Sequence, residues 1–158
     1  MIIIAQVMAH PNIFARKPEV VAKDLLGRYL VRKVPGSGIL TATIAGVGAY
    51  SGDLGQPSRA GMNYAPGEIF MMSYRGLHML NVATERSGVP SCVEIRAVRF
   101  GEELVEGSAR IANRLKIDQS VDGKYFEKVF RLGDKPVVRI QVKKEKGKSD
   151  NCVGFFSL

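Results

Sequence analysis

Residues 44–52 read Ile-Ala-Gly-Val-Gly-Ala-Tyr-Ser-Gly, an unusual sequence for a strand. They continue an apolar, β-branched run that begins at Ile39, and this run predicts a strand. Glycine packs no side chain and loses the most backbone entropy on ordering, so a strand interior disfavours it. Gly46 and Gly48 are two residues apart, so both lie on one face, and Tyr50 comes next on that face. The sequence therefore predicts a strand with open space beside a tyrosine.

The size and charge of the chain limit its class. It has 158 residues, enough for one domain, 1–158, with a sizeable core. It carries 23 Lys and Arg against 15 Asp and Glu, a net charge of +8. This excess fits a polyanionic partner such as nucleic acid or an anionic membrane surface, and the alternative is a basic protein with no such partner. No apolar run approaches the roughly 20 residues that a membrane span needs, so we expect no membrane partner.

The N-terminal stretch, Met1 to Ala9, is apolar but short, and no basic residue precedes it as in a signal peptide. We interpret it as an opening strand or an arm packed on the domain. Nothing marks export, so we expect a cytoplasmic or nucleoid-associated protein, or a nuclear one in a eukaryote. The two cysteines and two histidines show no metal-ligand spacing, so we expect neither a disulfide scaffold nor a metal site.

The remaining pattern predicts one α+β domain built on antiparallel sheet. Pro18 begins a short helix and Gly27 ends it. Two hairpins are expected, turning at 35–38 and at Arg75-Gly76, and 51–67 is expected to be a long loop. The expected strands are 28–34, 39–50, 68–74, 77–84, 92–100, 136–142 and 153–158. The expected helices are 18–26, 102–115, with a break or a serine cap at 107–108, and 125–130.

Six segments follow one another in a recognisable order. They are LLGRYLVR at 25–32, the strand that ends Gly48-Ala49-Tyr50, PGEIFMMSYRGLHMLNV at 66–82, VEIRAVRF at 93–100, EGSARIANRLKIDQSVDGKYF at 106–126 and VGFFSL at 153–158. Together they resemble the alkyladenine DNA glycosylases, also called methylpurine-DNA glycosylases. The resemblance implies a curved antiparallel β-sheet with short flanking helices.

The resemblance also implies a chemistry. Such enzymes bind double-stranded DNA from the minor-groove side, and a side chain at a hairpin tip enters the base stack while the damaged nucleotide flips into a pocket. Aromatic rings hold the flipped purine, which is often cationic. A glutamate activates the water that attacks the sugar as the base leaves. No cofactor and no metal are needed, and we expect a monomer.

Four pocket positions depart from the family pattern. Gly48 stands where the family has its catalytic glutamate, so we expect no general base there, and Gly46 replaces the other glutamate of that strand. Arg59 aligns with the stacking histidine, and a guanidinium stacks on a neutral ring but repels a cationic one. Met72 aligns with the second stacking tyrosine, although a methionine is more often part of a core.

Three pocket positions match the family. Tyr50 is expected to form one wall, or else to pack at a sheet edge. Asn81 corresponds to an asparagine near the pocket, or else is a hydrogen-bonded core residue. Arg96 corresponds to an arginine near the catalytic carboxylate, and burying it is costly unless it is paired.

Glu94 suggests how Arg96 is paired. It lies two residues before Arg96, on the same predicted face, where the family has an apolar residue. We expect Glu94 to pair with Arg96, and we consider Glu94 as a substitute general base. Asp53 and Glu68 are weaker candidates for that role.

Two segments are candidates for contacts with DNA. Tyr74, Arg75 and Gly76 form the predicted hairpin tip, where Arg75 would enter a narrow minor groove by its charge or else be a solvated turn residue. The charged loop 143–150 offers Lys143 and Lys144, followed by two further lysines, although such a loop is more often simply solvated.

Three functions fit these observations. The first is a DNA glycosylase that removes an alkylated or deaminated purine, although losing a general base typically costs about 10²–10⁴ in rate. The second is a catalytically inactive homologue that binds damaged, abasic or structured nucleic acid without excision. The third is a domain that binds a small molecule or a protein.

Overall fold

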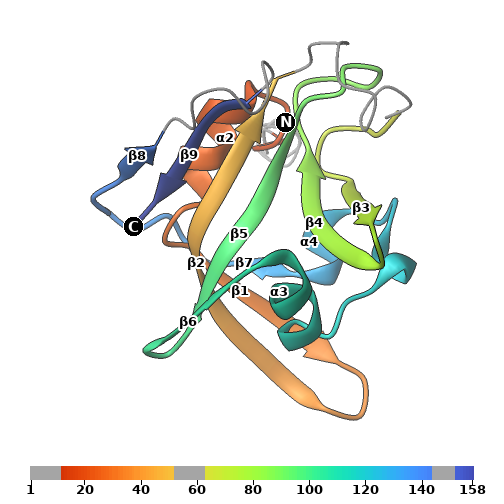
Figure 1. The fold of residues 1–158 in the computed structure, drawn as a ribbon, viewed down its shortest axis with the longest axis vertical. Coiled ribbons are helices and arrows are strands. Elements are labelled where there is room, and N and C mark those ends of the chain that lie inside the picture. Colours follow the sequence, from red (N-terminus) through yellow and green to blue (C-terminus); the bar gives the residue numbers. More distant parts are fainter. Residues whose placement is uncertain (1–11, 52–62, 144–151) are drawn as a thin grey trace, which may run out of the picture.

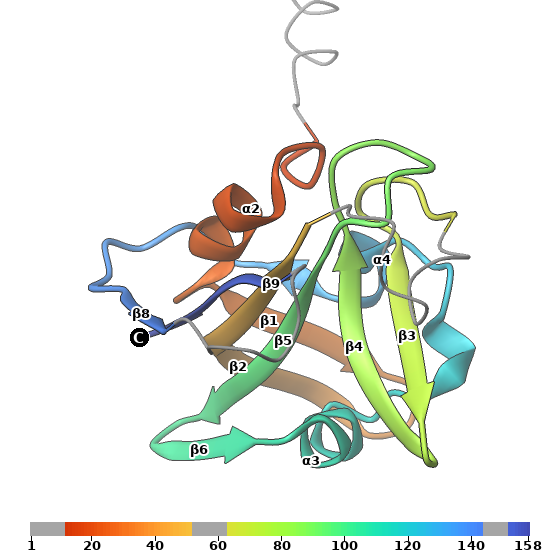
Figure 2. The ribbon, with the colours of Figure 1, turned by 45° about the horizontal axis from the view of Figure 1, so that its top comes forward.

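The structure is a computed structural model, and it describes residues 12–51, 63–143 and 152–158. Within these residues, nine strands form one curled antiparallel sheet (Figures 1 and 2). The main order is β3-β4-β5-β2-β1-β7, while β6 pairs with β5, β9 with β2 and β8 with β9. The strands are β1 (Tyr29–Val34), β2 (Gly38–Tyr50), β3 (Ile69–Tyr74), β4 (Leu77–Ala83), β5 (Cys92–Phe100), β6 (Glu103–Glu106), β7 (Arg131–Leu132), β8 (Gln141–Lys143) and β9 (Cys152–Ser157).

Strand β2 organises the sheet because it pairs with three other strands. Its first half pairs with β1, and its second half lies between β5 and β9. There Gly48 lies opposite Glu94 on one side and Phe155 on the other. The register with β5 shifts on either side of Gly46, which makes a β-bulge near Arg96. A bulge bends the strand and re-aims the side chains beside it.

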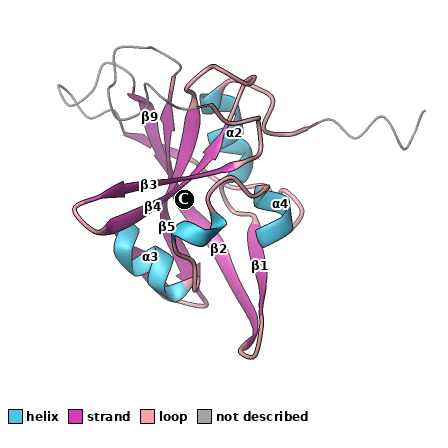
Figure 3. Ribbon diagram, turned by 90° about the vertical axis from the view of Figure 1, so that its right-hand side faces the viewer, coloured by secondary structure: helices cyan, strands magenta, loops and turns pink. Residues whose placement is uncertain are grey.

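Three helices in the described residues pack against the sheet: α2 (Pro18–Leu25), α3 (Ser108–Arg114) and α4 (Phe126–Val129), with a 3₁₀ turn, η2 (Gln119–Val121), before α4 (Figure 3). Helix α2 contacts β2, β5 and β9, and α3 contacts β4, β5 and β6. Their buried side chains join those of the strands in one main core, which includes Leu25, Ile95, Ile111 and Phe126. Ala42, Ile44, Val47 and Ala49 of β2 face this core. Gly46, Gly48 and Tyr50 alternate with the last two of these, so they face the other way.

Most of the expected elements are confirmed. Helix α2 ends before Gly27, whose φ of 85° is the left-handed conformation that glycine adopts easily. The hairpin of β3 and β4 turns at Arg75 and Gly76, both with positive φ, 51° and 77°. That is the turn geometry that matches strand twist in a two-residue loop. The expected N-terminal strand, most of the loop 51–67 and the loop after Lys143 lie outside the described residues.

The expected helix over 102–115 is wrong in its first half. After a turn at Gly101, residues 103–106 return along β5 as β6. The ladder hydrogen bonds and the burial of Val105 outweigh the helical pattern. The helix begins only at Ser108, which is not its cap, because the Ser108 hydroxyl donates to Glu94 instead.

The expected strand over 136–142 is also wrong. Residues 133–140 have no regular structure, and β8 is limited to Gln141–Lys143. Pro136 cannot donate to a ladder, and the Val137 side chain is fully exposed. The place beside β1 is taken instead by the short strand β7, which the sequence pattern did not predict.

Candidate functional site

One row of residues crosses five strands on the face of the sheet away from the main core. Phe155 of β9 lies opposite Gly48 of β2, and Gly48 lies opposite Glu94 of β5. Glu94 in turn lies opposite Asn81 of β4, and Asn81 opposite Phe70 of β3. Directly opposite residues of antiparallel strands share a face and touch. The unusual glycine strand therefore runs through the middle of a polar and aromatic row.

Glu94 is at the centre of a polar cluster. Its carboxylate accepts hydrogen bonds from the Tyr50 hydroxyl, at 3.3 Å, and from the Ser108 hydroxyl, at 3.4 Å. A guanidinium nitrogen of Arg96 lies 3.6 Å from the same carboxylate and donates to the Tyr50 oxygen at 3.4 Å. The expected pairing of Glu94 with Arg96 is confirmed.

Arg96 and Phe155 fill the space that Gly48 leaves. The Arg96 guanidinium carbon lies 4.3 Å from the centre of the Phe155 ring, a cation–π contact. A β-carbon added to Gly48 would lie 3.1 Å from both Arg96 Cδ and Phe155 Cε1. Glycine at 48 is thus what allows the guanidinium and the ring to lie together over β2.

Tyr50 contacts both Glu94 and Phe155. Its ring packs edge-on against the Phe155 ring, with centroids 6.4 Å apart. Burial raises the pKa of the Tyr50 hydroxyl well above its ordinary value of 10.0; the negative charge of Glu94 raises it further, and the positive charge of Arg96 opposes the rise. The hydroxyl therefore stays protonated at ordinary pH and remains a donor to Glu94.

Asn81 and Met72 lie on the same face but take less part in the cluster. Asn81 is 3% exposed, and its side chain donates to the Met79 carbonyl at 3.2 Å and accepts from the Cys92 thiol at 3.5 Å. Met72 is half-buried and lies opposite Met79. The hydrogen bonds of Asn81 fit the simpler expectation of a bonded core residue that borders the site.

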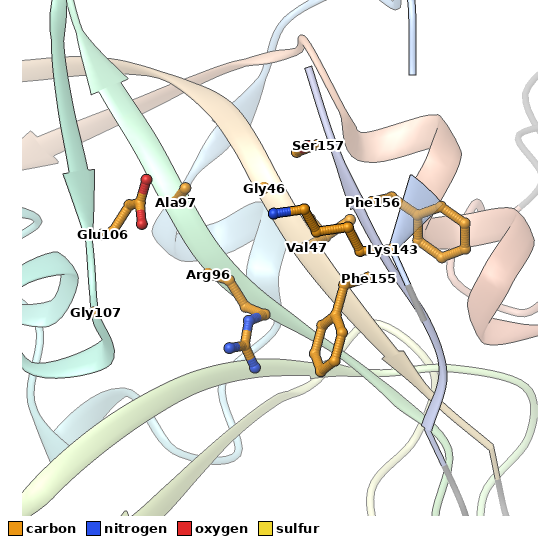
Figure 4. Close-up of a pocket in the computed structure, with 10 residues that line it drawn as sticks. All are labelled: Gly46, Val47, Arg96, Ala97, Glu106, Gly107, Lys143, Phe155, Phe156 and Ser157. Carbon is orange, nitrogen blue, oxygen red and sulfur yellow. The ribbon is translucent and has the colours of Figure 1, made fainter. Parts of the chain in front are cut away.

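An open cavity of about 380 Å³ adjoins the cluster (Figure 4). Figure 4 shows the Arg96 guanidinium beside the Phe155 ring, with Lys143 and Glu106 at other sides of the cavity. Its remaining lining is Gly46, Val47, Ala97, Gly107, Phe156 and Ser157. Cavities of roughly this size hold small ligands or single ring systems. Because Arg96 contacts Glu94 and also lines the cavity, it joins the two.

The other predicted site residues lie apart or outside the described residues. Arg59, Asp53 and Lys144 belong to the undescribed segments. The hairpin tip at Arg75 and Gly76 is exposed, and Tyr74 ends β3 just before it. Glu68 lies outside the cluster, and its carboxylate accepts a hydrogen bond from the backbone N–H of Ala65 at 3.1 Å.

Sequence reasoning missed two members of the cluster, Phe155 and Ser108. The terminal strand was expected, and its alternation places Phe155 and Phe156 on opposite faces, but nothing local pairs that strand with β2. Ser108 approaches Glu94 because α3 packs on β5, a long-range contact that no local signal reveals.

Within residues 12–51, 63–143 and 152–158, no group of three His, Cys, Asp or Glu side chains is placed to hold a metal ion. In the same residues, no helix has the length and apolar character that crossing a membrane requires.

Comparison with known proteins assigns the chain to a family. The family described as methylpurine-DNA glycosylase (MPG) matches residues 12–151. A protein named "Putative 3-methyladenine DNA glycosylase" from Streptomyces avermitilis is 32% identical to this chain, and the match covers 70% of this chain and 63% of the relative. A protein of the same name from Synechococcus elongatus is 30% identical, and the match covers 65% of this chain and 59% of the relative. One of that name from Psychrobacter cryohalolentis is 35% identical, over 68% of this chain and 56% of the relative. The chain thus spans about 60% of the length of these relatives. It belongs to the methylpurine-DNA glycosylase family.

Proposed function

We propose that this chain is a DNA-repair protein that binds duplex DNA, flips a modified purine out of the stack and hydrolyses its N-glycosidic bond. The observation that carries the proposal is the cluster of Tyr50, Glu94 and Arg96, in which a buried carboxylate is paired with an arginine that lines a ligand-sized cavity. Membership of the methylpurine-DNA glycosylase family supports the same conclusion, and the relatives carry the name "Putative 3-methyladenine DNA glycosylase".

The charge and shape of the molecule fit a DNA substrate. The net charge is +8, which favours a polyanion. The tip of the β3–β4 hairpin presents Arg75 in an exposed two-residue turn. In this proposal Arg75 enters the minor groove, with Tyr74 and Gly76 beside it, and Lys143 at the cavity contacts the DNA backbone. Such a substrate would place the protein at the nucleoid, or in the nucleus of a eukaryote.

A second candidate is a homologue that binds damaged or abasic DNA without excision. Position 48 carries no carboxylate, and the Arg96 and Phe155 side chains lie over it. A site covered in this way could hold a flipped nucleotide or an abasic sugar and still lack a base to activate water.

One experiment separates these two functions. The protein is incubated with duplexes that contain hypoxanthine, ethenoadenine or a methylated purine, and abasic products are then cleaved and counted. Binding to abasic and to plain duplex is measured in parallel at two salt concentrations. We expect excision of at least one of the modified purines and salt-sensitive binding.

The matching undamaged duplex is the control for nonspecific cleavage. Salt-sensitive binding to abasic duplex with no excision from any of the modified duplexes would favour the non-excising homologue. Neither binding nor excision would contradict both functions.

A further inference from the structure

We propose that Glu94 is the carboxylate that activates water in this chain, in place of a residue at position 48. The inference rests on the proposed excision activity and names the residue that carries it. Hydrolysis of a glycosidic bond passes through a state with positive charge on the sugar, which a nearby carboxylate stabilises. A positioned base also takes a proton from the attacking water. The reaction therefore calls for a carboxylate at the site.

Burial sets Glu94 apart from the other acidic residues. Among residues 12–51, 63–143 and 152–158, it is the one Asp or Glu that is buried, with 7% of its surface exposed. A buried carboxylate costs free energy unless polar partners surround it, and an uncharged residue of similar size would avoid that cost. Packing alone therefore does not explain a negative charge at this position.

The register puts Glu94 where its carboxylate can replace one at position 48. The two residues lie directly opposite each other on β5 and β2. Opposite residues of an antiparallel pair have Cβ atoms about 4.5–5.5 Å apart and point to the same face. A glutamate at position 94 of β5 therefore places its carboxylate in the same region of the site as a glutamate at position 48 of β2 would.

The neighbours of position 48 explain why the carboxylate has moved. The Arg96 and Phe155 side chains lie so close over Gly48 that any larger residue there must displace them. Their guanidinium–ring contact keeps Arg96 beside Glu94 and at the wall of the cavity. The carboxylate is thus one side chain away from whatever the cavity holds.

The Tyr50 and Ser108 hydroxyls orient the Glu94 carboxylate. Its distances to the Tyr50 and Ser108 hydroxyls, 3.3 Å and 3.4 Å, are longer than the usual length of such bonds, about 2.7–2.8 Å. Catalytic hydrogen bonds often reach their full strength only in the complex with substrate. Because burial and the charge of Glu94 raise the pKa of the Tyr50 hydroxyl, Tyr50 remains a donor and does not compete for the proton.

The proposed step is hydrolysis of the bond between the sugar and the purine. A water oxygen forms a bond to the anomeric carbon of the sugar while the bond from that carbon to the purine nitrogen breaks, and the bonding pair leaves with the purine. Glu94 takes one proton from the water and later releases it to solvent. An N-alkylated cationic purine leaves as the neutral base, whereas a neutral purine gains one proton from solvent as it leaves.

The test compares E94Q with wild type in single-turnover excision from the purine duplexes named above. We expect E94Q to lower the excision rate by about 10²–10⁴-fold and to leave binding to abasic duplex unchanged. In wild type, the rate should fall as acid protonates a carboxylate, and this acid limb should be missing from the residual rate of E94Q. E68Q is the matched control, because Glu68 is a half-buried glutamate away from the cluster, and it should keep the wild-type rate.

Each outcome bears on the inference. Equal rates for E94Q and wild type would overturn it, and a loss in E68Q alone would assign the role to Glu68. If E94Q does not fold, as judged by its melting temperature, E94D keeps the charge with a shorter reach; wild-type excision by a folded E94D would overturn the inference. A wild-type protein that binds abasic duplex but excises nothing would overturn the proposed activity itself, and that failure appears before any substitution is made.

Discussion

Two acidic residues of this protein are both paired with arginine, but the pairs differ in tightness. Asp24 on α2 is half-buried and accepts from an Arg16 nitrogen at 2.6 Å and from an Arg28 nitrogen at 2.9 Å. Glu94 on β5 is buried, yet its Arg96 nitrogen lies at 3.6 Å. The shorter contacts thus belong to the more exposed of the two carboxylates.

The difference distinguishes the Asp24 pair, which stabilises the fold, from the Glu94 pair, which belongs to the candidate site. Arg28 also donates to the backbone carbonyls of Asp24 and Gly133, so the Asp24 pair ties the end of α2 to the segment after β7. Short charge-assisted bonds of this kind stabilise a fold. Arg96, by contrast, divides its contacts among Glu94, Tyr50 and the Phe155 ring, at the wall of a cavity. Such an arrangement fits a group that changes its contacts when a ligand binds.

The largest expected effect is the difference in stability between two variants, D24N and E94Q, each of which removes one of these two charges. D24N should lower the free energy of unfolding by about 2 kcal/mol, because two close guanidinium groups lose their charged acceptor. For a chain of this length that is a fall of about 4–8 °C in melting temperature. E94Q should cost less, because glutamine still accepts from the Tyr50 and Ser108 hydroxyls and removes a buried charge. Thermal melts of both variants test this, and an equal loss would make Glu94 a structural residue like Asp24.

Acid should weaken the Asp24 pair. Burial alone would raise the pKa of the Asp24 carboxyl, but the hydrogen bonds and charges of Arg28 and Arg16 outweigh it and hold that pKa below its ordinary value of 3.8. A depressed pKa gives stability that is present above the ordinary value and is lost as the pH falls through the lower, folded-state value. Urea unfolding of wild type and D24N should therefore show a constant gap at neutral pH that closes toward zero below about pH 4. A gap of full size in strong acid would contradict this reading of the pair.

The smallest expected effect is the difference between the stability losses of alanine substitutions at Gly46 and at Gly48. A β-carbon at Gly46 would lie 3.0 Å from the Ala97 β-carbon, which cannot rotate away, whereas one at Gly48 would meet side-chain atoms of Arg96 and Phe155 that can shift. We expect G46A to cost about 1–2 kcal/mol and G48A less than about 1 kcal/mol. G48A should nevertheless slow excision by moving Arg96 relative to Glu94. Chemical unfolding of G46A and G48A measures the two stability losses, and the excision assay measures the rate of G48A. A larger stability loss in G48A than in G46A would contradict the prediction.

Much of the fold was predictable because its signals are local. The β3–β4 hairpin, helix α2 and strands β2 and β5 follow from periodicity and from turn residues such as Gly27 and Gly76. The two errors arose where pairing partners decide the outcome. The segment 103–106 became a strand because β5 was available beside it, and Pro136 and Val137 stayed irregular because β7 occupies the place beside β1.

For the site, the sequence by itself determined that Gly46, Gly48 and Tyr50 share one face of a strand, and that position 48 carries no carboxylate. It also placed Glu94 two residues before Arg96. Only the tertiary structure decided that Glu94 lies opposite Gly48, that Ser108 reaches it from α3, and that Phe155 lies over the glycine. The physical reason is that strand periodicity is a property of adjacent residues, whereas register and helix packing join residues far apart in the chain through long-range contacts.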